Sequence, residues 1–169
     1  MNETPSEVQV PETGRLAGID FGTVRIGIAT CDPSQNWVTP LGTYQARNKK
    51  LDGQHFLKLA SDEALVGWVI GLPIHCDGKE SQKSKEVREF GAWLANLTEL
   101  PIAFYDERFT TREARRLLQE ADLSSAKKKK RLDQLAAHLI LSHFLDHRAN
   151  RSQAGSDLSV SQNEALDDG

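Results

Sequence analysis

Apolar and polar positions follow two different spacings along the chain. Short apolar runs bounded by glycine are typical of strands, whereas apolar residues three and four apart are typical of helices. By this criterion the predicted strands cover residues 16–20, 26–30, 38–46, 65–71 and 101–106. The predicted helices cover residues 51–62, 81–97, 110–121 and 132–144. Three strands therefore come first, and helices then alternate with strands.

This order of elements predicts an α/β fold. Strands joined by short links pair antiparallel, while strands separated by a helix pair parallel. We therefore expect a five-stranded mixed sheet, three antiparallel strands and then two parallel strands, flanked by helices.

Composition divides the chain into a folded centre and two tails. Residues 1–14 contain three glutamates, two prolines and no base, and residues 148–169 are rich in Ser, Gln, Asn and Asp. Such segments bury too little apolar surface to offset the entropy of ordering. We expect a flexible N-terminal tail at 1–14, one folded domain at 15–147 and a disordered C-terminal tail at 148–169.

The net charge of −3 lies in the predicted tails. Residues 1–14 carry −3 and residues 148–169 carry −2, which leaves +2 for residues 15–147. A mildly basic folded domain permits a nucleic-acid partner without requiring one.

The sequence contains no apolar run long enough to span a membrane and no signal peptide, which predicts a cytoplasmic protein without a membrane partner. Its two cysteines, Cys31 and Cys76, have neither the spacing of a zinc site nor that of a redox pair. We expect both to be reduced and structural.

Asp20 is the first candidate for chemistry. An ionised carboxylate inside an apolar strand is costly to desolvate unless a cation, a metal or several donors meet it. Gly18, Gly22 and Gly27 leave the backbone around it open, so that a ligand or a second backbone can approach. The alternative is a plain hairpin whose glycines only make turns.

Glu107 and Asp133 are two further candidates for a ligand-binding site. Glu107 directly follows the last predicted strand, at the carboxyl end where α/β sheets bind ligands, although an acid before a helix also complements the helix dipole. Asp133 lies at the edge of a buried helical stripe beside Ala136 and Ala137, and the alternative for it is a solvated pair with Arg131 or a nearby lysine.

Together these segments resemble the YqgF/RuvX family, RNase H-like nucleases associated with pre-16S rRNA and also described as Holliday-junction-resolvase-like. The resemblance covers residues 15–147 and implies an RNase H-like fold. It rests on four motifs in order: Gly18-Ile-Asp-Phe-Gly-Thr23 with Arg25 to Gly27, Gly71-Leu-Pro73 with Asp77-Gly78, Asp106-Glu-Arg108 with Thr110-Thr111 and Ala114, and Leu132-Asp133 with Ala136-Ala137.

The resemblance implies that Asp20, Glu107 and Asp133 form a catalytic triad that binds Mg²⁺ or Mn²⁺, the hard cations that oxygen ligands suit. Arg108 would contact the scissile phosphate, unless it pairs with a nearby carboxylate, and Thr111 or Thr110 would fix its loop. A basic run next to Asp133 would attract phosphates, unless it is only a solvated surface; it comprises Lys127, Lys128, Lys129, Lys130 and Arg131.

The implied function is a nuclease that binds structured RNA and processes the 5′ end of pre-16S rRNA, as a monomer or weak homodimer. The alternatives are a resolvase acting on branched DNA and a non-catalytic nucleic-acid-binding factor. Residues 20–23 also resemble the phosphate-binding hairpin of the actin and Hsp70 superfamily, but those proteins hold nucleotide between two domains and this chain has the length of one.

Overall fold

The computed structural model of the 169-residue chain describes residues 9–74, 79–106 and 125–160. Its five strands are β1 (Arg15–Asp20), β2 (Arg25–Cys31), β3 (Val38–Gln45), β4 (Leu65–Leu72) and β5 (Ile102–Asp106). Its helices are α1 (Lys49–Asp62), α2 (Gln82–Thr98) and α4 (Ser125–Val160). The predicted helix at 110–121 lies outside the described residues.

The strands form one sheet in the order β3-β2-β1-β4-β5. β1 pairs antiparallel with β2, and β2 pairs antiparallel with β3. β4 pairs parallel with β1 on one side and with β5 on the other. The predicted mixed sheet, with an antiparallel half and a parallel half, is therefore confirmed.

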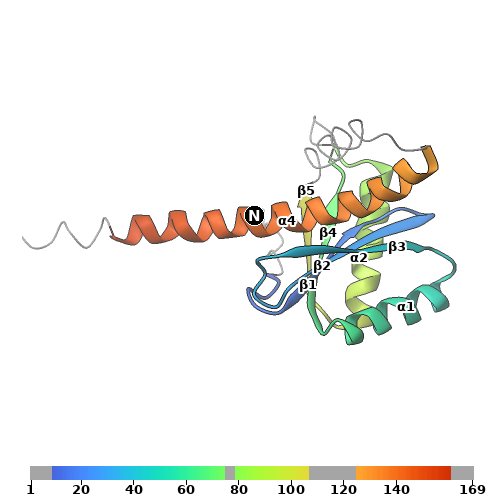
Figure 1. The fold of residues 1–169 in the computed structure, drawn as a ribbon, viewed down its shortest axis with the longest axis horizontal. Helices are drawn as coiled ribbons and strands as arrows, with labels where there is room; N and C mark the ends of the chain where they lie inside the picture. The colour runs from blue at the N-terminus through green and yellow to red at the C-terminus, as the bar shows by residue number, and fades with distance from the viewer. Residues whose placement is uncertain (1–8, 75–78, 107–124, 161–169) are drawn as a thin grey trace, which may run out of the picture.

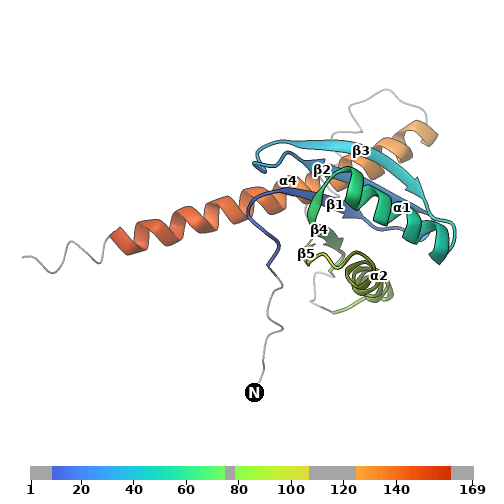
Figure 2. The same ribbon diagram turned by 90° about the horizontal axis from the view of Figure 1, so that it is seen from below.

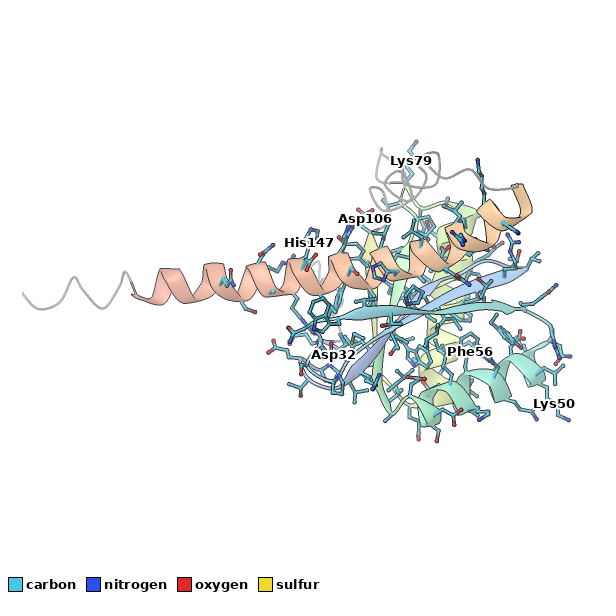
Figure 3. All side chains as sticks on the ribbon, in the orientation of Figure 1. Asp32, Lys50, Phe56, Lys79, Asp106 and His147 are labelled. Carbon is cyan, nitrogen blue, oxygen red and sulfur yellow. The ribbon has the colours of Figure 1, made fainter. Side chains whose placement is uncertain are left out.

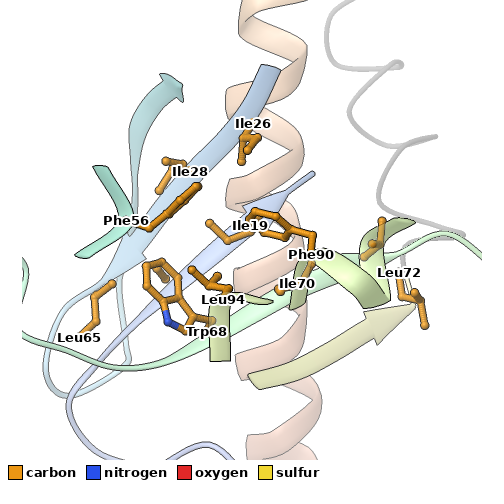
Figure 4. Close-up of a cluster of buried hydrophobic side chains, with 12 residues drawn as sticks. Ile19, Ile26, Ile28, Phe56, Leu65, Trp68, Ile70, Leu72, Phe90 and Leu94 are labelled. Carbon is orange, nitrogen blue, oxygen red and sulfur yellow. The ribbon is translucent and has the colours of Figure 1, made fainter. Parts of the chain in front are cut away.

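Helices cover both faces of this sheet, α1 and α2 on one face and α4 on the other (Figures 1 and 2). In Figure 3, Phe56 and Lys50 mark the α1 side and His147 marks the α4 side. The α1 and α2 side holds an aromatic core in which Phe56 packs edge-on against Trp68 and Phe90, with ring centroids 6.0 and 5.6 Å apart (Figure 4). This core packs α1 and α2 against one face of the sheet.

The first two helices begin at side-chain caps. The Asn48 carboxamide oxygen accepts a hydrogen bond from the Leu51 N–H at 3.0 Å, and the Ser81 hydroxyl accepts one from the Ser84 N–H at 3.1 Å. Each cap satisfies an N–H that has no partner within its helix. Both helices start within two residues of the predicted positions.

On the opposite face, α4 crosses β1 and β2 at very close range. A Cβ added at Gly18 would lie 2.7 Å from the Leu141 Cβ, and one added at Gly27 would overlap the carbonyl oxygen of Asp133. Side chains at these two positions would force the helix off the sheet. The glycines therefore set the height of α4 above the strands.

Helix α4 differs from the prediction at both ends. It begins at Ser125, so the basic run 127–131 lies in its first turns rather than in a polar stretch before it. It also continues to Val160, so the expected disordered tail from residue 148 is wrong for residues 148–160. Residues 148–169 contain few apolar residues, which is why the sequence predicts disorder there. No proline or glycine interrupts the helix before Gly155, however. Figure 1 shows this part of α4 projecting beyond the sheet.

The expected N-terminal tail is also shorter than predicted, because residues 10–14 pack on the domain. Val10 is buried, and the Gly14 N–H donates to the Pro33 carbonyl at 2.8 Å. The Arg148 guanidinium donates to the Pro11 carbonyl at 3.2 Å. Gln35 donates from its side chain to the Pro11 carbonyl at 3.0 Å. Contacts with segments distant in sequence thus order a stretch whose own composition is polar.

Cys31 is a buried free thiol whose sulfur accepts a hydrogen bond from the Leu16 N–H at 3.2 Å. Burial raises the pKa of this thiol, which disfavours the reactive thiolate. Cys76 lies outside the described residues. None of the helices, over the residues described, combines the length and apolarity that a bilayer crossing requires.

Candidate active site

Asp20 is the last residue of β1 and faces α4. Successive side chains of a strand point to opposite faces, so Leu16, Gly18 and Asp20 share one face. Leu16 packs in a cluster with Ile140 and Leu141 of α4, and Gly18 lies against Leu141. Asp20 is half-buried at the carboxyl end of this row.

Asp133, on α4, lies at the same end of the sheet as Asp20, and we call this place the corner of the site. The register of the antiparallel pair sets Asp20 opposite Gly27, and Gly27 lies directly beneath the Asp133 carbonyl. Ala137, one turn further along α4, is fully buried on the sheet. Two acids that are 113 residues apart in sequence therefore both lie beside Gly27, Asp20 next to it in the sheet and the Asp133 backbone above it.

Arg25 pairs with Asp133. Its Nε atom lies 2.9 Å from the Asp133 Oδ2 atom, and the two side chains are 31% and 19% exposed. Because Ile26 and Ile28 belong to the core on the α1 side, alternation turns Arg25 toward α4 with Gly27. The Asp133 Oδ2 atom is buried, and its contact with Arg25 is a close ion pair whose geometry is not that of a hydrogen bond.

This partner differs from those considered from the sequence, which were Arg131 and the neighbouring lysines. Arg131 is exposed on α4. Arg25 appeared in the sequence analysis only as part of a motif. The signal that would have found it is its spacing: it lies two residues before Gly27, on the strand face that the helix covers.

The third predicted acid lies beyond the described residues. The parallel strands β1, β4 and β5 end at Asp20, Leu72 and Asp106, which places their carboxyl ends along one edge of the sheet. Glu107 is the next residue after Asp106 in the sequence, and Glu107, Arg108 and Thr111 all lie outside the described residues. Their roles remain predictions.

The basic run occupies the start of α4, before Asp133 on the same helix. Lys127 and Arg131 are exposed, and Lys128 is half-buried. The side chains of Lys129 and Lys130 lie outside the described residues. This end of α4 therefore adds positive charge beside the corner where the two acids meet.

The donor set of this corner fits a hard divalent cation. Asp20 and Asp133 offer carboxylate oxygens, which Mg²⁺ and Mn²⁺ favour. In the part of the chain that the structure describes, no three potential metal-ligating side chains come together. The described residues thus provide two of the three predicted ligands.

Sequence comparison relates residues 14–147 to a family described as RuvX: Holliday junction resolvase. A protein of Rhodopirellula baltica named "Putative pre-16S rRNA nuclease" is 46% identical over 167 residues, which cover 98% of this chain and 96% of that protein. A protein of the same name from Bradyrhizobium sp. strain BTAi1 is 40% identical over 145 residues, 86% of this chain and 90% of its own.

Solved structures show the same fold at low sequence identity. The RuvC of T. thermophilus in complex with a Holliday junction substrate matches with a TM-score of 0.52 and 14% identity, over 81% of this chain and 96% of that one. A second Thermus thermophilus RuvC structure matches with a TM-score of 0.50 and 14% identity, over 80% and 96%. The predicted RNase H-like fold is therefore confirmed.

Proposed function

The chain belongs to the RuvX family, and we propose that it is a metal-dependent nuclease that hydrolyses phosphodiester bonds. The observation that carries the proposal is that Asp20 and Asp133, from a strand and a helix far apart in sequence, both lie beside Gly27. Carboxylates brought together from a strand and a helix repel one another unless a cation lies between them. A site of this kind suits the chemistry of phosphate hydrolysis.

In this proposal each residue of the site has a distinct task. Asp20, Asp133 and Glu107 would hold Mg²⁺ or Mn²⁺, which when bound stabilises the charge developing on the phosphate and activates the attacking water. Arg25 keeps Asp133 oriented toward the strand end through its 2.9 Å ion pair. Arg108 would contact the scissile phosphate, and Thr111 would fix the loop that carries it.

The proposed substrate is structured RNA, cleaved near the 5′ end of precursor 16S rRNA in the cytoplasm. The name of the relatives in Rhodopirellula baltica and Bradyrhizobium supports this choice. The basic run at the start of α4, with Lys127 and Arg131 exposed, would hold the phosphate backbone without reading bases. We propose that the protein acts as a monomer or weak homodimer.

The second candidate is cleavage of a four-way DNA junction, which the family description favours. Both substrates present phosphates to the same acids, so they differ in shape rather than in chemistry. One assay therefore has to compare them under identical conditions.

The experiment incubates the purified full chain with a precursor 16S rRNA fragment and with a four-way DNA junction, each with Mg²⁺ or Mn²⁺. We expect RNA cleavage that Asp20→Asn, Glu107→Gln and Asp133→Asn each reduce at least 100-fold, because each removes one charged ligand. Circular dichroism of each variant checks that the fold is kept.

The possible outcomes separate the candidates. Symmetric nicking of the junction without RNA cleavage would replace the RNA substrate with DNA. Binding of either substrate without turnover would favour a non-catalytic factor. Full activity in one of the three variants would remove that acid from the proposed triad.

A further inference from the structure

A hollow of about 340 Å³ lies on the sheet face opposite to the acids, between the β1–β2 hairpin and helices α1 and α2. Figure 1 shows the hairpin between β1 and β2 and the start of α1 on the same side of the molecule. Its size is within the range of small-molecule sites. The proposed nuclease chemistry, on the α4 side, does not use it.

Aromatic rings form one wall of the hollow. Phe21 stacks on Phe90, with ring centroids 4.4 Å apart and planes inclined by 26°. Trp93 continues the wall, 5.6 Å from Phe90, and is only half-buried. A flat ligand can therefore lie against exposed ring surface that the protein already holds in place.

Carboxylates form the rim. Asp52, Glu86 and Glu89 line the hollow together with a single ammonium group, that of Lys49, among the described residues. The Asp52 Oδ1 atom is fixed by hydrogen bonds from the Tyr44 hydroxyl at 2.7 Å and the Arg47 N–H at 2.9 Å. The inner side of such a rim accepts hydrogen bonds from N–H groups.

The hollow is joined to the acid site through consecutive residues. Asp20 faces α4, and Phe21 follows it in the chain and packs on the opposite side against Phe90. Gly22 then forms the rim between the two faces, where a Cβ would lie 2.5 Å from the Arg25 carbonyl oxygen. Gly22 also lines the hollow, so the tip of the β1–β2 hairpin lies between the acid site on one face of the sheet and the hollow on the other.

We propose that this hollow binds the unpaired base of a nucleotide next to the scissile phosphate, and that it prefers bases with an exocyclic amino group. Aromatic stacking supplies affinity for any base, while carboxylates accept hydrogen bonds from the amino group of cytosine or adenine. Uracil offers carbonyl oxygens at the corresponding edge, which the carboxylates repel. A base inside a duplex cannot reach the hollow without being flipped out, so the substrate is unpaired at this nucleotide.

This inference rests on the proposed function, because it places a nucleic-acid strand at Asp20. An arginine or lysine side chain of a protein partner would also suit an aromatic wall with an acidic rim. The direct link between Phe21 and Asp20 favours the nucleobase. The protein partner is therefore an outcome of the test rather than a second proposal.

The test measures binding in the presence of EDTA, so that it does not depend on turnover. Fluorescence anisotropy compares 12-residue single strands of oligo-C, oligo-A and oligo-U and an abasic strand, using the full chain. We expect oligo-C and oligo-A to bind more tightly than oligo-U, and the abasic strand to bind most weakly. Trp93→Leu should weaken oligo-C binding about tenfold and leave abasic binding unchanged.

Two further variants keep the result interpretable. Trp37→Leu makes the same substitution at a side chain that is 77% exposed, in the connection between β2 and β3, and should leave all affinities unchanged. The double variant Glu86→Gln/Glu89→Gln changes only the rim and should remove the preference for oligo-C over oligo-U. It serves as the test if Trp93→Leu fails to fold.

Equal binding of all four strands by the parent, or equal loss for Trp93→Leu and Trp37→Leu, would overturn the base pocket and leave the nuclease proposal intact. Absence of any nucleic-acid binding would count against the proposed function itself. Binding of an arginine-rich peptide that depends on Trp93, with no dependence on bases, would replace the nucleotide with a protein partner.

Discussion

The guanidinium of Arg25 lies 2.9 Å from the carboxylate of Asp133 and ties β2 to α4 at the corner where Asp20 ends its strand. The pair is partly shielded from water, so it is worth more than the exposed Lys58–Asp62 pair on α1, whose side chains are 75% and 55% exposed. Arg25 thus partly offsets the repulsion between two neighbouring acids before any cation is added.

Arg25→Met should lower the melting temperature in EDTA by a few degrees, corresponding to about 1 kcal/mol, because it leaves the Asp133 charge without this partner. Added Mn²⁺ should then raise the melting temperature more in Arg25→Met than in the parent. Thermal melts with and without Mn²⁺ measure both effects. Lys58→Met is the matched control and should change neither, while equal melting of parent and Arg25→Met in EDTA would contradict the prediction.

Gly27→Ala should displace α4, because the added methyl group would overlap the Asp133 carbonyl oxygen. We expect a loss of stability of about 1–3 kcal/mol and a loss of cleavage, since Asp133 moves with the helix. Urea unfolding and the RNA assay measure the two effects.

Gly53→Ala is the control for that substitution. Its added methyl group would meet Leu97 at 3.7 Å, an ordinary contact, and alanine favours the helix by about 0.5–1 kcal/mol. Its stability should be equal to or above that of the parent. A Gly27→Ala protein with parental stability and activity would show that α4 does not depend on this close approach.

Replacement of Lys127 to Lys130 by alanine should weaken binding to all nucleic-acid sequences alike and reduce its salt dependence. Each lost phosphate contact lowers the slope of log affinity against log salt by about 0.7 for single strands. Anisotropy titrations at several salt concentrations measure this slope. A control with the same charge change replaces four exposed lysines on the other face of the sheet, Lys50, Lys58, Lys83 and Lys85. Equal slopes in the two variants would show that the run is only a solvated surface.

Stability should fall on acidification because of His138 on α4. Burial lowers the pKa of His138, and the nearby His143 shifts it in the same direction. The unfolded chain, with a histidine pKa near 6.5, then binds more protons than the folded protein, so stability is full above that pH and falls as the pH drops toward the folded value.

His138→Gln should reduce this pH slope without removing it. The remainder is expected from His55, which stacks on Tyr44 at 3.8 Å and whose pKa is also lowered by burial. Urea unfolding between pH 5 and pH 7.5 gives the slope. A slope identical to that of the parent would show that His138 does not contribute.

Val10→Ala should cost about 2 kcal/mol, because Val10 is only 5% exposed and packs against Gly67. Val24→Ala makes the same change at a side chain that is 65% exposed and should alter stability by less than about 0.5 kcal/mol. Thermal melts compare the two. Equal melting of both variants would restore the expectation that residues 10–14 form a loose tail.

The order of the elements and their pairing can be read from the amino-acid pattern alone. Alternation and helical spacing are local properties, because the face on which a side chain lies follows from its backbone geometry within a few residues. For this reason the five strands, the helices α1 and α2, and the position of Asp133 at the border of a buried stripe followed from the pattern. The resemblance of four ordered motifs then identified the family.

Which distant groups contact one another depends instead on how the folded elements pack. The partner of Asp133 is Arg25, more than a hundred residues away, and Val10 is buried beside α4 although it belongs to a segment with three glutamates and no base. The hollow beside Phe21 likewise takes its walls from a hairpin and two helices. Contacts of this kind depend on how closely packed elements approach one another, here at Gly18 and Gly27, and no local spacing encodes that distance.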